Sequence, residues 1–304
     1  MTTSLSTSLL DDCHAALADG DVAPLDEFVL CLDATRRELS VEEWNAYIAD
    51  VIAPHPLRGL LHEEPFTRRA YEKPRGYAGD APMLDLVYTD SRPLGMSDLG
   101  GKLYDWAMPK PGFGSVRARR EILASVIDEM AIERPSPRIL SVACGHLREA
   151  QSSVAVRDRR VGEVVALDQD RESLALVARE QRDRNVTPVH ANIRRLLAGG
   201  TEFGTFDLAY AAGLYDYLDE AVAQALTAAM FRALKPGGRL VVANFAPNLP
   251  VIGYMEAVMD WMLRYRVESD VERFAARLPR PEIAELSTFR DTPGNVVYLS
   301  VRKS

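Results

Sequence analysis

The chain has 304 residues and a mass of 33.7 kDa, with 47% hydrophobic and 26% charged residues. These values lie near the globular average and argue against bulk disorder, collagen and coiled-coil architectures. The net charge of −8 has the wrong sign for holding phosphate backbones, so a nucleic-acid partner is disfavoured unless a local basic patch exists.

Cysteine usage and hydropathy both indicate an intracellular protein. Cys13, Cys31 and Cys144 cannot all pair within one chain, and their spacings match no CxxC or zinc motif. The first 20 residues lack a basic segment followed by an unbroken apolar run, and no stretch approaches the roughly 18 apolar residues of a membrane span. We therefore expect a cytoplasmic protein with reduced thiols and no membrane span; the oligomeric state stays open.

Residues 1–112 read as helices and loops. Ser40 and Glu43 form a capping box that predicts a helix from Val41 to about Ala53, ending before Pro54. After about residue 65 the chain becomes rich in Gly and Pro and includes KPRGYAGD (73–80) and LGMSDLGG (94–101). Long irregular segments are often binding loops or lids, so residues 1–112 are predicted to be a helical lid or substrate domain.

From residue 113 onward, apolar strands alternate with helices. After a helix from 115 to about 133, strands are expected at 138–142, 164–167, 187–190, 206–211 and 239–245, with the last intervening helix ending at LKPGG (234–238). This alternation predicts a parallel sheet with helices on both faces. Residues 287–291 and 296–302 flank a short Thr-Pro-Gly-Asn turn, which predicts an antiparallel terminal hairpin. The fold class is therefore α/β, with residues 113–304 as one domain.

Small and polar residues follow the first three strands, where open α/β sheets bind their ligands. Ala143 and Gly145 form a turn that lets backbone amides approach a ligand, and Asp168, about 23 residues later, can accept both hydroxyls of a ribose. Asn192 can read an adenine edge while Ile193 contacts the ring. The alternatives are a ligand-free turn, and helix capping by Asp168 and Asn192. Together the three positions predict an adenosine ligand.

The series ILSVACG, VVALDQD, HANI, FDLAYAAGLYDYL and LKPGGRLVVANF resembles class I S-adenosylmethionine (SAM)-dependent methyltransferases, over about 190 residues and in the family order. The resemblance implies a Rossmann-like sheet of seven strands, SAM as cofactor, S-adenosylhomocysteine as product, and no metal. In that family the first turn holds the methionine part, the acid after the second strand the ribose, and the position of Asn192 and Ile193 the adenine. A dehydrogenase fits less well, because it needs three glycines and lacks the antiparallel ending.

The first motif departs from the family pattern. Ser141, Ala143 and Leu147 stand where the family has an acid and two glycines, and only Gly145 matches. The resemblance therefore suggests that Arg148, Glu149 or the lid takes part in holding the methionine part.

YEKPRGYAGDAPMLDLVY (71–88), with AGLYDYL and MDWMLRYR (259–266), looks like a bacterial methyltransferase subgroup that includes enzymes making 3-hydroxy-palmitic acid methyl ester. This resemblance implies a small-molecule acceptor, with a carboxylic acid becoming a methyl ester as the leading class. A carboxylate is already nucleophilic and needs no general base. His146 and His190 are candidate bases, but structural roles are the more common alternative.

The predicted site combines residues of both domains. The expected cofactor-binding residues are Arg75, Tyr77, Asp80, Tyr104, Ala143, Gly145, Glu149, Asp168, Gln169, Asn192, Ile193, Ala211 and Gly213. Tyr215 and Asp216 are predicted to be catalytic, through attraction of the sulfonium to an aromatic face and through proton removal or acceptor orientation. The expected substrate-binding residues are Tyr217, Tyr254, Met255 and Arg264. The alternative is that two of residues 215–217 pack under the next helix, and that the apolar stripe of a helix around 254–266 is core.

Other activities remain open at this point. The acceptor atom is an oxygen, nitrogen or carbon of another secondary-metabolite precursor in one alternative, and in a second SAM itself cyclises and releases methylthioadenosine. A third alternative is a module that binds SAM without catalysis. The absence of an [Asn/Asp]-Pro-Pro-aromatic motif and of any Pro-Cys dipeptide argues against methylation of bases or glutamine amides.

Overall fold

A computed structural model describes residues 7–89, 92–199 and 203–304, and the chain divides into two compact units. The amino-terminal unit comprises Met1–Val116 and Asn248–Met262, and the sheet unit comprises Arg117–Pro247 and Leu263–Ser304. The segment that follows the fifth strand thus belongs to the amino-terminal unit. The assignment of residues 1–112 to a lid and of residues 113–304 to SAM binding stays a prediction.

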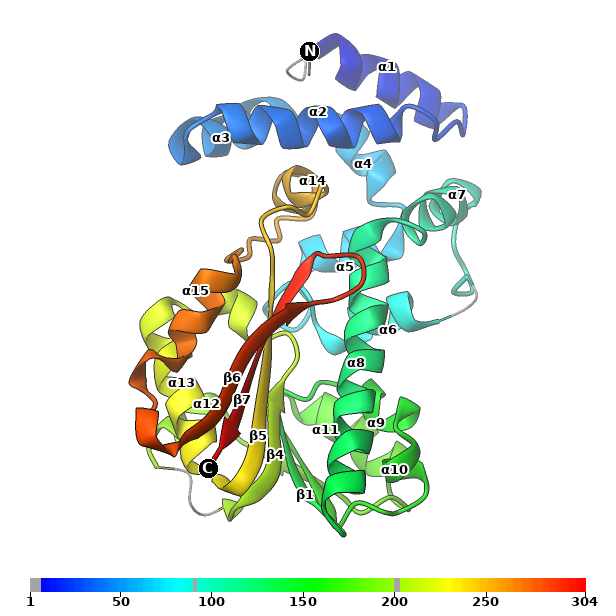
Figure 1. The fold of residues 1–304 in the computed structure, drawn as a ribbon. Coiled ribbons are helices and arrows are strands. Elements are labelled where there is room, and N and C mark those ends of the chain that lie inside the picture. Colours follow the sequence, from blue (N-terminus) through cyan, green and yellow to red (C-terminus); the bar gives the residue numbers. More distant parts are fainter. Residues whose placement is uncertain (1–6, 90–91, 200–202) are drawn as a thin grey trace. The chain divides into compact units, whose positions relative to one another are not determined.

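The amino-terminal unit is built from short helices (Figure 1). Its elements are α1 (Thr7–Ala18), α2 (Leu25–Glu38), α3 (Val41–Tyr47), η1 (Ile48–Ile52), α4 (Leu57–Leu61), α5 (Pro65–Glu72), α6 (Ala81–Tyr88), α7 (Asp98–Ala107) and α14 (Ile252–Ala257). The predicted capping box is confirmed, because the Ser40 side chain accepts the Glu43 N–H and the Glu43 carboxylate accepts the Ser40 N–H. The helix continues through the π-helical η1 and ends before Pro54, as predicted.

The stretch after residue 65 is more helical than predicted. KPRGYAGD is indeed the connection between α5 and α6, but residues 98–101 of LGMSDLGG already lie in α7. The Ser97 side chain starts this helix by accepting the Gly100 N–H at 2.9 Å. A Cβ atom at Gly100 would lie 2.5 Å from the Glu63 carbonyl oxygen, so the glycine serves close packing rather than a loop.

The predicted helix around 254–266 is shorter than expected, because α14 ends at Ala257. Asp260 has a left-handed backbone with φ of 47°, and the Trp261 N–H donates to the Met255 carbonyl at 2.9 Å. The chain therefore leaves the helix within one turn, and Met262, the last residue of the predicted apolar stripe, is 47% exposed.

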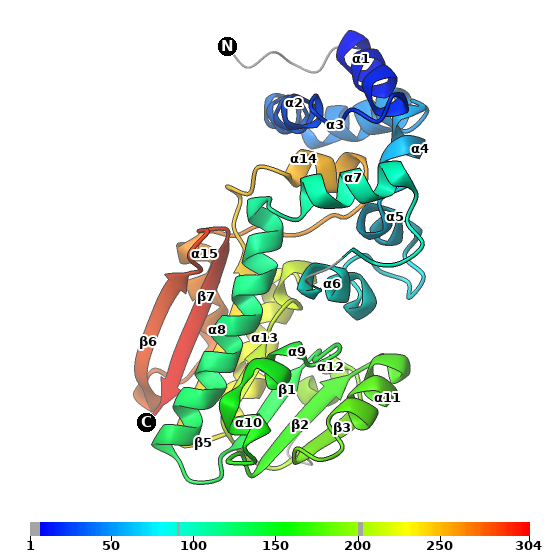
Figure 2. The ribbon, with the colours of Figure 1, turned by 90° about the vertical axis from the view of Figure 1, so that its right-hand side faces the viewer.

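The sheet unit contains one sheet of seven strands, confirming the predicted α/β architecture (Figure 2). The strands are β1 (Arg138–Val142), β2 (Glu163–Asp168), β3 (Val186–His190), β4 (Phe206–Ala211), β5 (Leu234–Phe245), β6 (Ile283–Arg290) and β7 (Val296–Lys303). Their order is β3-β2-β1-β4-β5-β7-β6, with β1 to β5 parallel and β7 antiparallel to both of its neighbours. The strand order reverses between β1 and β4, and ligands of such sheets bind at the carboxyl ends beside that point.

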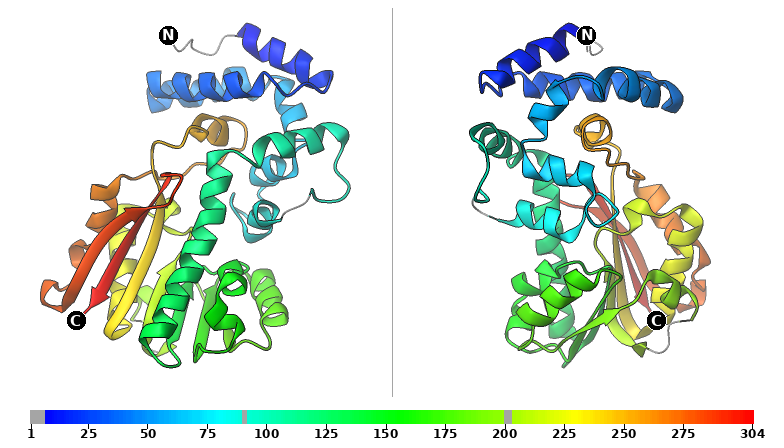
Figure 3. Two further views of the ribbon diagram at one scale, coloured as in Figure 1. Left: turned by 45° about the vertical axis from the view of Figure 1, so that its right-hand side comes forward. Right: turned by 180° about the vertical axis from the view of Figure 1, so that it is seen from behind.

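Helices cover both faces of this sheet (Figure 3). They are α8 (Pro111–Glu133), α9 (Arg148–Ser152), α10 (Val154–Arg157) and α11 (Arg171–Glu180) on one face, and α12 (Ile193–Leu197), α13 (Glu220–Arg232), α15 (Glu268–Glu272) and the 3₁₀ segment η4 (Arg273–Arg277) on the other. Two further 3₁₀ turns are η3 (Tyr215–Tyr217) and η5 (Arg280–Glu282). Alternate strand residues such as Leu140 and Val142 pack with Phe231 and Phe274 of the second layer. Burial on both faces explains why the strands read as nearly continuous apolar runs.

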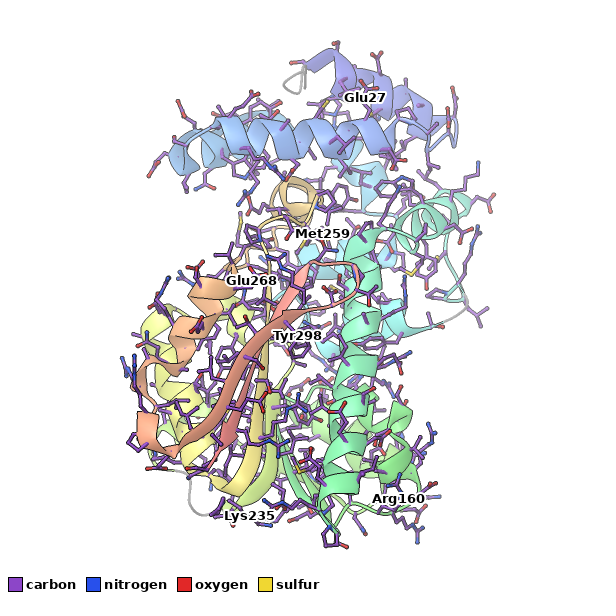
Figure 4. All side chains as sticks on the ribbon, in the orientation of Figure 1. Glu27, Arg160, Lys235, Met259, Glu268 and Tyr298 are labelled. Carbon is purple, nitrogen blue, oxygen red and sulfur yellow. The ribbon has the colours of Figure 1, made fainter. Side chains whose placement is uncertain are left out.

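The LKPGG segment was predicted to end a helix, but in the structure it starts β5. Helix α13 already ends at Arg232, and β5 begins at Leu234. Gly237 does have the expected left-handed backbone (φ +70°), but it lies where the register between β4 and β5 shifts. Lys235 lies at the amino end of β5 and pairs with Asp207 at 2.7 Å (Figure 4).

Two expectations about the whole chain can be compared with the described residues. All three cysteines are free and buried. In residues 7–89, 92–199 and 203–304, none of the helices has the length and apolar character that a membrane crossing needs.

Candidate functional site

The turn after β1 has a left-handed backbone at three positions, although only one of them is a glycine. Ala143, Gly145 and Leu147 have φ values of 54°, 52° and 51°, and these are the positions at which the family resemblance expects glycine. A left-handed backbone costs a non-glycine residue about 1–2 kcal/mol. Because strain of this kind persists where the surrounding structure requires it, the path of this turn is a structural requirement.

Asp168 joins this turn to the end of β2. One carboxylate oxygen accepts the Gly145 N–H at 2.8 Å, the other accepts the Asp170 N–H at 2.8 Å, and the residue is 6% exposed. The N-cap of α11 is Asp170, not Asp168. An ionised carboxylate has about four acceptor positions, so Asp168 retains the capacity to accept ligand hydroxyls.

The residues after β3 have ordinary structural contacts. Asn192 is the N-cap of α12 and accepts the Arg194 N–H at 3.1 Å, which is the capping alternative noted from the sequence. Ile193 packs against the core, and the His190 ring lies 3.1 Å from the carbonyl oxygen of the exposed Gln169. The predicted adenine contacts of Asn192 and Ile193 stay predictions.

A buried acid lies beside β1 even though position 141 is a serine. Glu149, in α9, is buried and accepts the Tyr210 hydroxyl at 2.6 Å. Tyr210, on β4, pairs across the sheet with Ser141. Burial raises the pKa of Glu149, while Tyr210 and the neighbouring Arg119 oppose the rise. Of the two candidates for the methionine part, Glu149 thus faces the interior, whereas Arg148 pairs with Glu180 at 2.6 Å.

Tyr215 does not occupy the position predicted for a catalytic residue. Its side chain is fully buried, its hydroxyl lies 2.9 Å from that of Thr227 in α13, and its ring packs against Phe274. The ring therefore belongs to the hydrophobic core rather than to a surface that could face a methyl group, which corrects the prediction for this residue. Tyr217, two residues later, is exposed.

Asp216 lies between these tyrosines and is held by backbone groups. It is 2% exposed, its Oδ1 accepts the Phe245 N–H at 2.6 Å, and its carbonyl oxygen accepts the Arg264 N–H at 2.7 Å. Burial raises the pKa of Asp216 to about 6, and Arg119, the Phe245 amide and Arg266 oppose this rise. The carboxyl group is therefore mostly ionised at neutral pH.

Arg266, the last residue of the MDWMLRYR segment, is a buried neighbour of Asp216 for which the sequence predicts no role of its own. Its guanidinium is buried and donates to the Tyr215 carbonyl at 2.9 Å, the Leu218 carbonyl at 2.6 Å and the Asn244 side chain at 2.7 Å. These bonds tie the turn after β4 to the end of β5. Arg264 and Arg266 both belong to that segment, and no pattern in the sequence distinguishes the buried Arg266 from the exposed Arg264.

Arg119, in α8, is the second buried arginine that the sequence did not suggest. It is 4% exposed, and its guanidinium carbon lies 5.7 Å from the centre of the Phe245 ring. A Cβ atom placed on Gly213, in the turn after Ala211, would lie 3.4 Å from its Nη1. A signal was present in the sequence: Arg119 shares a helical stripe with Leu123 and Ile127, where an apolar residue is expected.

In the amino-terminal unit, ion pairs fix both ends of the KPRGYAGD loop. Arg69 forms two bonds, of 2.8 and 2.7 Å, with the Asp80 carboxylate, which also accepts the Met83 N–H. At the other end, the left-handed Lys73 pairs with Asp260. Asp80 thus has a structural role within this unit, and the loop between the two pairs carries the predicted residues Arg75 and Tyr77.

The other predicted residues of this unit also make internal contacts. The Tyr104 hydroxyl donates to the Leu86 carbonyl at 2.9 Å, and the buried Tyr254 hydroxyl lies 3.3 Å from that of Thr67. Met255 is buried. Their predicted contacts with cofactor or acceptor stay predictions.

The segment around α14 is anchored by charge as well as by apolar contacts. Glu256 accepts two bonds from Arg36, of 2.6 and 2.9 Å, and one from the Trp44 indole at 2.9 Å. This segment is therefore an integral part of the amino-terminal unit, as its grouping with residues 1–116 also indicates.

The predicted residues thus fall into two groups. The sheet unit brings Ala143, Gly145, Glu149, Asp168, Asn192, Gly213 and Asp216 to the carboxyl ends of β1 to β4. Arg75, Tyr77, Asp80, Tyr104, Tyr254 and Met255 belong to the amino-terminal unit. In the part of the chain that the structure describes, no three His, Cys, Asp or Glu side chains are grouped to hold a metal ion.

Comparison with known protein families gives a match for the part of the chain that contains the residues at the ends of β1 to β4. Residues 139–238 match a protein family described as a methyltransferase domain. A search of curated protein sequences finds no significant match to the chain.

Solved structures with a similar fold share little sequence with this chain. A possible exported protein from Bordetella parapertussis is 20% identical, with a TM-score of 0.58 over 74% of this chain and 79% of that one. The 1,6-didemethyltoxoflavin-N1-methyltransferase of Burkholderia thailandensis is 17% identical, with a TM-score of 0.45 over 62% and 78% of the two chains. The magnesium protoporphyrin IX methyltransferase of Synechocystis is 12% identical, with a TM-score of 0.49 over 78% and 98%.

The family match and the sheet topology agree. The sheet order β3-β2-β1-β4-β5-β7-β6 is that of a Rossmann-like methyltransferase fold, and the matched region runs from β1 into β5. Residues 139–238 therefore form a methyltransferase domain.

Proposed function

We propose that the chain is a SAM-dependent methyltransferase that methylates the carboxylate of a small molecule and produces a methyl ester and S-adenosylhomocysteine. In this reaction a carboxylate oxygen attacks the methyl carbon, the carbon–sulfur bond breaks, and its electron pair stays on sulfur. No proton is transferred, so the protein has to orient two reactants and exclude water rather than supply a base.

One observation carries the SAM site: the 2.8 Å hydrogen bond from the Gly145 amide to the Asp168 carboxylate. This bond joins an acid at the end of β2 to the turn after β1, and open α/β sheets bind their ligands at such strand ends. We assign the ribose to Asp168, the methionine part to the turn from Ala143 with Glu149, and the adenine to Asn192 and Ile193. Gln169, Ala211 and Gly213 complete the cofactor set.

The acceptor side is assigned to the turn after β4. Asp216 is fixed through the Phe245 amide and the Arg264 amide, so it suits a role in orientation. Tyr217 lies on this turn, and Arg264 lies on the segment whose amide is bonded to it. Both side chains are exposed, and we assign them to binding of the acceptor. Arg264 supplies a positive charge for an anionic acceptor.

The amino-terminal unit is assigned to substrate binding. Two parts far apart in sequence, the KPRGYAGD loop and the segment around α14, are joined in this unit by the pair between Lys73 and Asp260. Ion pairs at both ends limit the conformations of the loop, which suits a preorganised ligand-binding loop. We assign Arg75, Tyr77, Asp80 and Tyr104 to the cofactor side of this unit, and Tyr254 and Met255 to an apolar acceptor chain.

A second candidate is methylation of a hydroxyl or amine, with Asp216 as general base. The observation that favours it is the pKa of Asp216, which burial raises to about 6 and thus towards the range of an effective base at neutral pH. In this reaction the acceptor oxygen or nitrogen attacks the methyl carbon while Asp216 takes up the acceptor proton.

The test is to incubate the purified protein with SAM and with carboxylic acids of increasing chain length, phenols and amines, and to identify both products by mass spectrometry. A methyl ester with S-adenosylhomocysteine supports the first candidate, and an ether or N-methyl product supports the second. Methylthioadenosine would instead establish cyclisation of SAM, and the absence of any nucleoside product would contradict both candidates.

The Asp216→Asn variant separates the two candidates further. Loss of a general base lowers kcat about 10²–10⁴-fold, whereas we expect less than about tenfold for an already ionised acceptor. Asp219→Asn is the matched control, because Asp219 caps α13 through the Val222 N–H and asparagine caps a helix equally well. This control should keep wild-type activity with either acceptor.

A further inference from the structure

Arg119 is a buried cation whose guanidinium lies between the ring of Phe245 and the backbone of Gly213. It is 4% exposed, and its guanidinium faces the Phe245 ring on one side. On another side it contacts Gly213, where a Cβ atom would lie 3.4 to 3.6 Å from Nη1, Nη2 and the guanidinium carbon. A side chain larger than that of alanine at position 213 would therefore displace the guanidinium.

The two residues that border this guanidinium also border Asp216. Phe245 donates its backbone N–H to the Asp216 carboxylate at 2.6 Å, and Gly213 precedes Asp216 by one short turn. Arg119 thus reaches the acceptor end of the sheet from α8, an element that precedes the whole matched methyltransferase region.

We propose that Arg119 is a positioning residue that keeps Asp216 ionised and oriented at the acceptor side of the methyl-transfer site. The inference rests on the proposed function in placing the acceptor beside Asp216. Arg119 acts through Asp216 and needs no contact of its own with the acceptor.

The charges around Asp216 support this role. Two cations face it, Arg119 from α8 and Arg266 from the segment after α14, and both oppose the rise in the pKa of Asp216 caused by burial. From β5 the Phe245 amide has the same effect, and the flanking Tyr215 side chain makes its hydrogen bond to Thr227 instead. Arg266 is already bonded to three oxygen acceptors, so its position is fixed by other groups. Arg119 also opposes the raised pKa of Glu149, which links the two buried acids through one cation.

The test measures the titration of Asp216 without any substrate. The free energy of unfolding is determined by urea denaturation between pH 4 and 8 for the wild type, Asp216→Asn, Arg119→Met and the double variant. With Arg119 present, the difference in unfolding free energy between the wild type and D216N should stop changing with pH near pH 6. With methionine at position 119, the difference between R119M and the double variant should keep changing to at least one pH unit higher.

Two further variants keep the test decisive. The limiting pH is the pH at which the difference in unfolding free energy between the proteins with aspartate and with asparagine at position 216 stops changing. Arg119→Lys keeps the charge and should leave this limiting pH within about half a pH unit of the wild type. It replaces Arg119→Met in the test if Arg119→Met does not fold. Arg120→Met is the matched control on the same helix, because Arg120 pairs with the adjacent Glu121, and it should leave the limiting pH unchanged. The same limiting pH with arginine and with methionine at position 119 would overturn the proposal.

Activity then separates this inference from the proposed function. With an acceptor identified, the lower limb of the pH profile of kcat/KM should move to higher pH in Arg119→Met by the same amount as in the unfolding data. A shift in the unfolding data without any such movement would overturn the positioning role while leaving methyl transfer intact. If the wild type methylates no acceptor, the proposed function fails, whatever the titration shows.

Discussion

The ends of β2 and β4 each carry a buried aspartate, but the two carboxylates are held by different kinds of partner. Asp168 accepts two backbone N–H groups, from Gly145 and Asp170. Asp216 accepts one backbone N–H, from Phe245, and lies near the cations of Arg119 and Arg266. In the site proposed above, the path of the backbone thus holds the carboxylate assigned to the cofactor, whereas buried side-chain charges surround the carboxylate assigned to the acceptor.

The largest expected effect comes from removing a charge at the acceptor end. Arg266→Met leaves the carbonyls of Tyr215 and Leu218 and the Asn244 side chain without their donor, so we expect a loss of about 3–5 kcal/mol in the free energy of unfolding. Urea denaturation measures this loss. Arg264→Met is the matched control: its side chain is exposed, and the change should stay within about 0.5 kcal/mol. Equal effects of the two variants would remove Arg266 from the supporting structure.

The next effect concerns the pH dependence of stability. The pKa of Asp216 is raised from 3.8 to about 6, so the folded state binds the proton more tightly than the unfolded state, and stability falls as pH rises through this window. Each tenfold change in proton affinity is worth about 1.4 kcal/mol, so from pH 4 to 7 the wild type should lose about 2.5 kcal/mol relative to Asp216→Asn. Parallel pH profiles of the two proteins would show that Asp216 titrates normally.

A smaller effect is expected at the cofactor end. Asp168→Ala removes the hydrogen bonds assigned to the ribose and should weaken SAM binding by about 1–3 kcal/mol, measured by calorimetry. Asp170→Ala is the control, because Asp170 caps α11 and its loss should cost about 1 kcal/mol of stability without changing SAM affinity. An unchanged affinity in Asp168→Ala would contradict the ribose assignment.

The smallest effect tests the strained turn. At φ of 54°, Ala143→Gly relieves backbone strain but adds conformational entropy to the unfolded chain, so the net gain in stability should be below about 1 kcal/mol. Ala150→Gly, in the regular helix α9, should instead lose about 1 kcal/mol. Thermal unfolding of both variants would give shifts of opposite sign. A loss of stability in Ala143→Gly would mean that the methyl group of Ala143 contributes more than its backbone costs.

The sheet could be predicted from the sequence to a large extent, because its strands are buried on both faces and form apolar runs separated by helices. The bounds of β4 and the start of β7 agree with the prediction to the residue. The LKPGG segment was misassigned, since a left-handed glycine ends a helix and forms an irregularity in a strand equally well. The shortness of α14 depends on a bond from Trp261 to Met255, which no periodicity reveals.

The candidate site could be predicted only in part. Asp168 and Gly145 follow strands directly, so their neighbourhood follows from the topology alone. Tyr215 was assigned to the site although its ring points into the core, because position after a strand does not determine the direction of a side chain. Arg119 and Arg266 reach the acceptor end from segments about 100 and 50 residues away from Asp216, and their burial depends on tertiary packing.

The chain passes from one unit to the other at residues 116–117, 247–248 and 262–263. A truncation that removed residues 1–116 would deprive Glu256 of Arg36 and Trp44, and Tyr254 of Thr67. It would leave the Glu256 carboxylate uncompensated in a mostly apolar insertion. Residues 1–116 and the insertion 248–262 therefore depend on each other for their packing and have to be kept together. A chimaera that exchanges the substrate region between relatives has to exchange both segments at once.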